Sequence, residues 1–102
     1  MNYRNAKVLQ EARNHPCQLC GASDGTVVAA HSNQSRHGKG MQIKAHDIYV
    51  AYLCGICHHQ IDQGFLYSRE MKQQLWDSAH KKTIPLFFHL LGADAIRLLD
   101  HD

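Results

Sequence analysis

Four cysteines stand in two pairs whose spacing suits a metal ion. Cys17 and Cys20 form one CxxC pair, and Cys54 and Cys57 form the other. Thiolates are soft ligands that suit Zn²⁺, and a shell of four sulfurs leaves no position open for water. The two pairs therefore predict a closed structural zinc site. Such a site would contribute directly to folding, because a chain of 102 residues buries only a modest core.

A zinc-finger-like arrangement is the alternative for the same ligand types. Cys17, Cys20, His31 and His37 form a CxxC…H…H series, with the ten residues 21–30 between the second cysteine and the first histidine. This spacing is slightly short for a finger. The stretch around the histidines is also flanked by glycine and lacks the apolar period of a finger helix. Because this arrangement would leave the second CxxC pair without partners, the four-cysteine site is the preferred prediction.

A histidine and an aspartate four residues apart follow the second CxxC pair. His58 and Asp62 fall on one face of the helix expected here, because side chains at i and i+4 project in the same direction. An imidazole and a carboxylate can share one divalent cation and leave coordination positions for water and a phosphate oxygen. The alternative is that His58 packs near the zinc while Asp62 is simply an exposed helix residue. His59 is rotated away from this face and is expected to be a bystander.

Short elements must position these residues, followed by a helical extension. Ser68 is a candidate N-cap for a helix over 69–82, and Pro85 is expected to open another helical stretch that ends at Gly92. The large apolar residues gather in this extension and predict core packing. From propensity and from glycine and proline punctuation, we expect helices over 4–14 and 55–64, strands over 26–30 and 48–53, and a loop over 32–46.

Charge and hydropathy bear on the partners and the location of the protein. The net charge is only +2, but the stretch 31–46 carries Arg36, Lys39 and Lys44 and no acidic residue. A basic loop suits a polyanion, so we expect these three side chains to contact phosphates; the alternative is a solvated loop. His37 is open between a metal ligand, a phosphate contact and neither. No apolar run reaches membrane-spanning length and no signal peptide is evident, which predicts a cytoplasmic protein without a membrane partner.

The order of these features resembles a nuclease motif. A strand ending in Ala30-His31, a glycine-rich loop, a second strand and CxxCH on a helix resemble the HNH (ββα-metal, His-Me finger) motif. More narrowly, AHSNQSRHGKGMQIKAHDIYVAYLCGICHHQID is similar to small phage and prophage nucleases of the recombination-enhancement, RecA-dependent type and to YbcO-like nucleases. The likeness covers roughly residues 17–64. It implies an α+β fold with a zinc-stapled ββα-metal core at 17–64. The chain length indicates one domain over 1–102, and the helix signals outside the likeness add a helical C-terminal extension at 68–102.

The resemblance also implies a function. It implies a divalent-metal-dependent DNA endonuclease that acts in phage or prophage DNA recombination or metabolism in the cytoplasm of a bacterial host. His31, at the end of the first strand, would be the general base that activates water against a phosphodiester. His58 and Asp62 would hold one Mg²⁺ or Mn²⁺, which stabilises charge on the phosphate and on the leaving oxygen. Within this family, a RecA-type recombinase filament is the implied partner beside DNA.

The chain departs from the motif at three positions. Ala30 precedes the base histidine where many members carry a metal-binding Asp or His, and Asp62 stands where His is frequent. The central Asn that orients the base has no match. His46 or Asp47 occupies about that place, and Asp47 is preferred because a carboxylate can accept a proton from the imidazole. The alternatives are a non-catalytic zinc-binding nucleic-acid module and a protein that contacts a host partner through its C-terminal helices.

Overall fold

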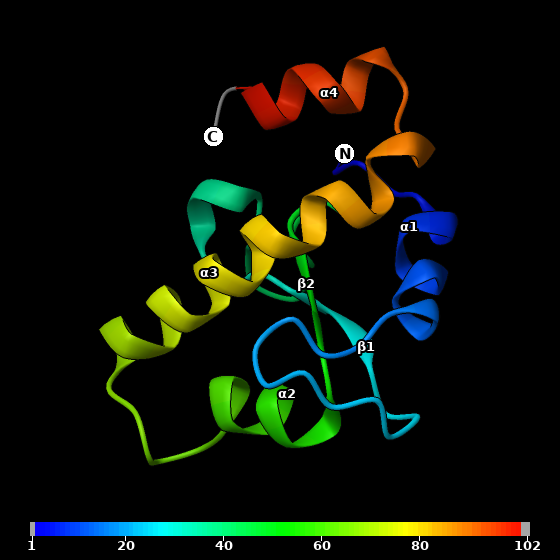
Figure 1. Cartoon of the computed structure of the whole chain (residues 1–102). Coiled ribbons are helices and arrows are strands. Elements are labelled where there is room, and N and C mark those ends of the chain that lie inside the picture. The colour runs from blue at the N-terminus through cyan, green and yellow to red at the C-terminus, as the bar shows by residue number, and fades with distance from the viewer. Residues whose placement is uncertain (1, 101–102) are drawn as a thin grey trace.

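Two short antiparallel strands lie at the centre of the molecule, with helices packed around them (Figure 1). The computed structural model describes residues 2–100, with strands β1 (Val28–His31) and β2 (Val50–Leu53). The register places His31 opposite Val50. Every side chain of β2 is buried, as expected from its apolar residues on both faces, whereas β1 has exposed and buried positions. The predicted α+β class is confirmed. Met1 and the last two residues of the predicted extension lie outside the described residues.

Side chains from other elements satisfy the outer edge of β2. Thr83 Oγ1, on helix α3 (Arg69–Phe87), accepts the backbone N–H of Tyr52 at 3.1 Å and donates to the carbonyl of Ala79 at 2.8 Å. The backbone N–H of Gln18 donates to the carbonyl of Tyr52 at 2.8 Å. Buried backbone groups need partners. Helix α3 and the first cysteine loop therefore close this edge in place of a third strand.

The predicted N-terminal helix is present in two parts. Helix α1 (Ala6–Gln10) passes into a 3₁₀ turn (Glu11–Asn14). The Asn5 side chain caps α1 by accepting the backbone N–H groups of the second and third helical residues. Val8 is fully buried and anchors the helix against β1. The helical turns end ahead of Pro16, because the residue before a proline disfavours helical geometry.

The C-terminal extension contains one long helix where the sequence predicted two. Helix α3 is capped by Ser68, whose Oγ accepts the N–H of Met71 at 3.1 Å, as expected. The prediction that the helix ends near residue 82 and that Pro85 opens another is wrong, because Pro85 lies inside α3. A proline in a helix interior costs about 3 kcal/mol. Here Pro85 is on the exposed side, and the fully buried Phe87 anchors the last turn in the core.

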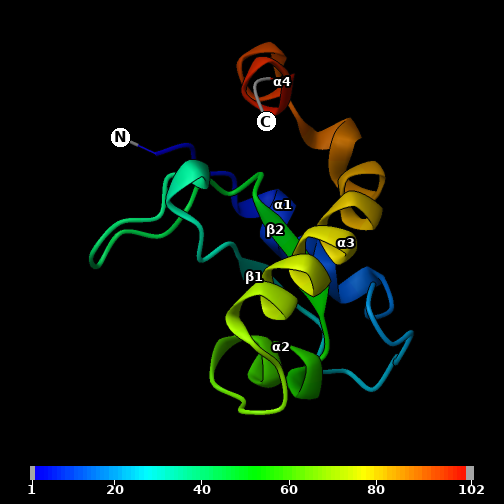
Figure 2. The same ribbon diagram turned by 90° about the vertical axis from the view of Figure 1, so that its left-hand side faces the viewer.

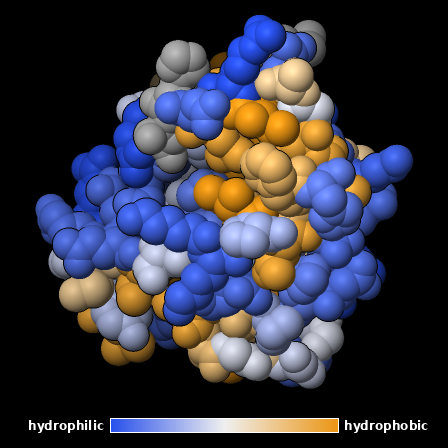
Figure 3. Space-filling model, turned by 45° about the horizontal axis from the view of Figure 1, so that its top comes forward, coloured by the Kyte–Doolittle hydropathy of each residue, from blue (hydrophilic) through white to orange (hydrophobic). Residues whose placement is uncertain are grey.

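The remaining described residues form a 3₁₀ turn (Phe88–Leu90) and helix α4 (Ala93–Asp100). The hydroxyl of Tyr49 donates to the carbonyl of Leu98 at 3.0 Å and ties α4 to the start of β2. Figure 3 looks onto this end of the molecule, where an apolar area is bordered by hydrophilic side chains. Among the helices that the structure describes, none has the length and apolar character needed to cross a bilayer.

Both strands begin two residues later than predicted. Asp24 Oδ1 accepts the N–H and the hydroxyl of Thr26, which places the first predicted strand residue in a turn. Before β2, the N–H of Tyr49 donates to the carbonyl of His46, which again forms a turn. The stretch 32–46, predicted as a loop, contains one 3₁₀ turn (Ser35–His37), and the part after this turn projects to one side of the body before the chain returns to β2 (Figure 2).

Candidate metal centre and active site

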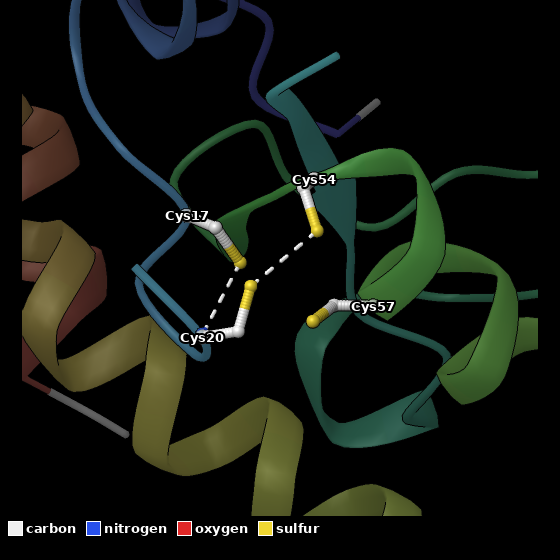
Figure 4. A group of neighbouring side chains, drawn as sticks. All are labelled: Cys17, Cys20, Cys54 and Cys57. Atoms are coloured by element: carbon white, nitrogen blue, oxygen red, sulfur yellow. Dashed lines mark hydrogen bonds between the residues drawn. The ribbon is translucent and has the colours of Figure 1, made fainter. Parts of the chain in front are cut away.

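The four cysteines come together at one end of the sheet (Figure 4). Their sulfur atoms all lie within 4.8 Å of one another, and the Sγ atoms of Cys20 and Cys54 are 3.6 Å apart. Four thiolates around one tetrahedral Zn²⁺ at about 2.3 Å would lie about 3.8 Å from one another. The cluster therefore fits a structural zinc ion. Among the described residues neither His31 nor His37 joins this group, so the finger-like arrangement is wrong.

Local structure aims the two cysteine pairs at each other. In the first pair, the N–H of Gly21 donates to the carbonyl of Cys17 at 2.9 Å, and Gly21 adopts a φ of +83°, which suits glycine. The chain thereby folds back as a tight knuckle. In the second pair, Cys54 directly follows β2 and Cys57 lies in the first turn of helix α2 (Gly55–Asp62). A zinc ion would thus join the knuckle, the strand and the helix.

The thiols of this cluster have unlike environments. Burial raises the pKa of the Cys17 thiol, but backbone N–H groups of Cys20, Cys54 and Leu19 point at it and bring the pKa down to about 6. Burial, together with the neighbouring sulfurs, raises the pKa of Cys57 well above its usual value. Four adjacent thiolates repel one another unless a cation neutralises them. A divalent metal supplies that charge and favours the deprotonated form of every thiol.

His31, the last residue of β1, contacts the predicted orienting residue. Its Nε2 lies 2.7 Å from Oδ1 of Asp47, which is only 3% exposed. The other carboxylate oxygen accepts the backbone N–H of Asn5 at 2.7 Å, and an N–H of the Arg4 guanidinium donates to Oδ1 at 3.2 Å. Three donors thus converge on one buried carboxylate. Asp47 is held in place by the N-terminal segment and in turn orients the imidazole.

His46, the other candidate for the orienting role, has a different contact. Its Nδ1 accepts the backbone N–H of Tyr3 at 2.9 Å. Burial, followed by the positive charge of Arg4, lowers the pKa of His46. Gly38 lies against its ring, since a Cβ there would be 2.7 Å from Cδ2. His46 therefore anchors the N-terminal segment and the loop.

His58 and Asp62 meet on one face of α2, as their spacing predicts. Nε2 of His58 lies 2.9 Å from Oδ2 of Asp62. This hydrogen bond raises the pKa of His58 and lowers the pKa of Asp62. Two ligand atoms about 3 Å apart suit adjacent positions around an octahedral Mg²⁺ at about 2.1 Å. His59 is exposed, and among the described side chains it forms no hydrogen bond or ion pair with this pair.

Asn33 connects β1 to this pair. Its Nδ2 donates to Oδ1 of Asp62 at 3.1 Å, and Asn33 follows His31 by two residues. The end of β1 is thereby tied to the last turn of α2. Sequence reasoning passed over Asn33; the available signal was an amide side chain just beyond the proposed base.

The residues of the predicted phosphate-binding loop have different surroundings. Arg36 forms an ion pair with Asp77 of α3 at 3.4 Å. Lys39 is partly buried and lines a surface cavity, and Lys44 is exposed. His37 is buried: Nδ1 lies 2.7 Å from the hydroxyl of Ser32, and the ring stacks on Tyr49 with centroids 4.2 Å apart. His37 is therefore part of the core and is not placed for a phosphate contact.

His80, which lies outside the predicted motifs, also belongs to the core. It is 4% exposed, and its ring stacks on Trp76 with centroids 4.8 Å apart. Its Nδ1 donates to the carbonyl of Val50 at 2.8 Å. His80 thus helps to hold α3 against β2.

The fold and the cysteine cluster define a small α+β protein with a four-cysteine metal site of the structural zinc type. No family model matches the chain, and no curated protein or solved structure matches it.

Proposed function

We propose that this protein is a divalent-metal-dependent nuclease that hydrolyses DNA phosphodiesters, with the cysteine-bound zinc as a structural staple. The proposal combines the resemblance of residues 17–64 to the HNH motif with the geometry at the ends of β1 and α2. The observation that carries it is the hydrogen bond between Nε2 of His31 and Oδ1 of Asp47, which are 2.7 Å apart. Asn33, two residues after His31, connects this segment to the His58–Asp62 pair.

His31 is chemically suited to act as general base. A carboxylate only accepts hydrogen bonds, so the proton of a neutral imidazole resides on Nε2, which faces Asp47. Nδ1 is then unprotonated and can take a proton from water. The His31 side chain is 18% exposed, which allows water to reach it. A base so placed typically contributes about 10²- to 10⁴-fold to the rate.

His58 and Asp62 would hold the catalytic Mg²⁺ or Mn²⁺. When bound, the ion would stabilise negative charge on the phosphate and the leaving oxygen. Mg²⁺ commonly keeps several waters and uses one or two protein ligands, so a two-residue site is sufficient. Asn33 donates to one oxygen of Asp62 and leaves the other facing His58. Its role is to orient the carboxylate.

Plasmid cleavage by the zinc-loaded protein with Mg²⁺ or Mn²⁺ tests the proposal. His31→Ala should reduce nicking by about 10²-fold or more, whereas His59→Ala on the exposed side of α2 should not. Zinc content and thermal unfolding must match those of wild type in both variants. If His31→Ala nicks as fast as wild type, the assignment of the base fails.

A non-catalytic zinc-binding nucleic-acid module is the second candidate. In its favour, the cysteine cluster is the single group of three or more metal-ligand side chains among the residues that the structure describes. Ala30 supplies no ligand, and His58 and Asp62 already bind each other. This candidate predicts salt-sensitive DNA binding with no cleavage under any metal. A RecA-type recombinase as partner rests on the resemblance alone and is tested by adding such a filament to the nicking assay.

A further inference from the structure

A groove lined by cationic side chains lies between the loop after β1 and the first turns of α3. Two adjoining cavities, of about 230 and 530 Å³, make up this groove. They share four lining residues, two from the loop and two from the helix: Asn33, Gln34, Arg69 and Gln73. Asp62 and Lys72 line the smaller cavity, and Arg36 and Lys39 line the larger one. The groove therefore runs from the His58–Asp62 pair to the basic loop.

The charges along the groove favour a polyanion. Arg69 and Lys72 stand three residues apart on α3 and form one wall. Arg36, held by Asp77 at 3.4 Å, and Lys39 belong to the opposite wall. Asp77 also accepts from Gln34 at 2.8 Å, so α3 fixes part of that wall. Among the residues that line the two cavities, Asp62 alone is acidic, and it lies at the end of the proposed metal pair.

Exposed aromatic residues lie in the short segment that joins α2 to α3. Phe65 is 100% exposed and Tyr67 is 43% exposed, with Leu66 between them at 73%. This segment connects Asp62 to Arg69, and both of these residues line the smaller cavity. Exposed rings in a segment that begins and ends at a cationic groove suit base stacking, which is sequence-tolerant because every base has a π-face.

We propose that the groove binds a single strand of nucleic acid, with Arg69 and Lys72 on phosphates and Phe65 and Tyr67 stacked on unpaired bases. A duplex keeps its base faces inside the stack, so rings of this kind can contact them only where the strands are unpaired. The inference rests on the proposed function for its substrate class. It adds that the nucleic acid reaches the His58–Asp62 pair unpaired. The wall of α3 that guides it lies outside residues 17–64, the segment that resembles the HNH motif.

Binding without cleavage tests the cationic wall. The zinc-loaded protein is titrated into labelled oligothymidylate by fluorescence anisotropy, with no Mg²⁺ or Mn²⁺, over a range of salt concentrations. For single strands, each phosphate contact makes the fall of log Kobs with log salt steeper by about 0.7. Arg69→Gln and Lys72→Gln should each reduce the slope by about that amount. Lys82→Gln is the matched control, because Lys82 is exposed on the same helix and lines neither cavity.

Substitution of the ring tests stacking separately from charge. Phe65→Leu keeps an apolar side chain but removes the ring, so it should weaken binding to oligothymidylate about tenfold. Phe65→Tyr should bind like wild type, and Leu66→Ala should change little. Binding of a blunt duplex of the same length should not respond to Phe65→Leu. Thermal unfolding and zinc content serve as controls for folding.

Two results would overturn the inference. One is a duplex bound as tightly as oligothymidylate, and the other is wild-type affinity and salt slope in Arg69→Gln, Lys72→Gln and Phe65→Leu. Cleavage by wild type together with either result would retain the nuclease proposal and reject the groove. Groove-dependent single-strand binding without cleavage under any metal would retain the groove and reject the nuclease.

Discussion

The Asp47→Asn substitution isolates the buried carboxylate that joins the N-terminal segment to the end of β1. Oδ1 of Asp47 accepts from His31 and Arg4, and Oδ2 accepts the backbone N–H of Asn5. An asparagine offers one accepting oxygen and one donating NH₂ group. Whichever way the amide turns, its NH₂ group faces at least one former donor.

The expected loss of stability follows from this count of donors. Hydrogen bonds to charged groups contribute about 1.5–3 kcal/mol, and a buried donor left unsatisfied costs about 1–3 kcal/mol. Asp47 is 3% exposed, so water cannot replace the lost acceptor. We therefore expect the free energy of unfolding to fall by about 2–4 kcal/mol. For a domain of this size that lowers Tm by roughly 10–20 °C.

Thermal unfolding of the zinc-loaded protein by circular dichroism measures this loss, with Asp77→Asn as the matched control. Asp77 also accepts hydrogen bonds from two side chains, but its own side chain is 34% exposed. Surface pairs of that kind contribute at most about 1 kcal/mol. Nicking provides a second readout. If the amide NH₂ turns toward His31, Nε2 must accept, Nδ1 carries the proton, and the proposed base is lost.

A small effect would refute this reasoning. If Asp47→Asn unfolds within a few degrees of Asp77→Asn, the carboxylate does not stabilise the fold as its contacts indicate. If nicking is unchanged as well, Asp47 does not orient His31.

Two further predictions concern the zinc cluster and the pH dependence of stability. Cys57→Ser should lower the zinc content from one ion per chain to none and abolish the folded near-ultraviolet signal, because a structural zinc contributes about 10–16 kcal/mol; a folded, zinc-loaded variant would contradict the four-cysteine site. The pKa of His46 is lowered in the folded state, so protonation of this residue opposes folding and stability is lost as pH falls below the usual value of 6.5. The variant His46→Asn, whose Oδ1 can still accept from Tyr3, should show a flatter decline in unfolding free energy in that window; an unchanged decline would exclude His46 as its source. His58, whose pKa Asp62 raises, acts with the opposite sign: its stabilisation is present below 6.5 and is lost as pH rises through the raised pKa.

Features governed by local spacing could be predicted from the sequence. The CxxC pairs identify a zinc-type cluster because ligand type and spacing are properties of short segments. The contact of His58 with Asp62 follows from the helical period alone. The burial of both faces of β2 follows from its unbroken apolar residues. The cap at Ser68 needs only a hydroxyl at the start of a helix.

Contacts between distant segments were decided by tertiary packing. Helix α3 continues through Pro85 because burial of Phe87 anchors its last turn, which no local pattern reveals. Thr83 replaces a third strand at the edge of β2 only because α3 crosses there. His37 and His80 are core residues because both pack near Tyr49, although their sequence surroundings are polar.

The candidate site shows the same division. The sequence by itself predicts His31 at the end of the first strand and Asp47 just before the second. It also predicts His58 and Asp62 on one face of the helix that follows the second CxxC pair. The tertiary structure alone brought Arg4 and Asn5 onto Asp47 across more than forty residues and set α3 beside the loop to form the groove. The physical reason is that ligand spacing and helical period are set by residues close together in the sequence. Burial of the sheet under α3 depends instead on contacts between residues far apart in the sequence.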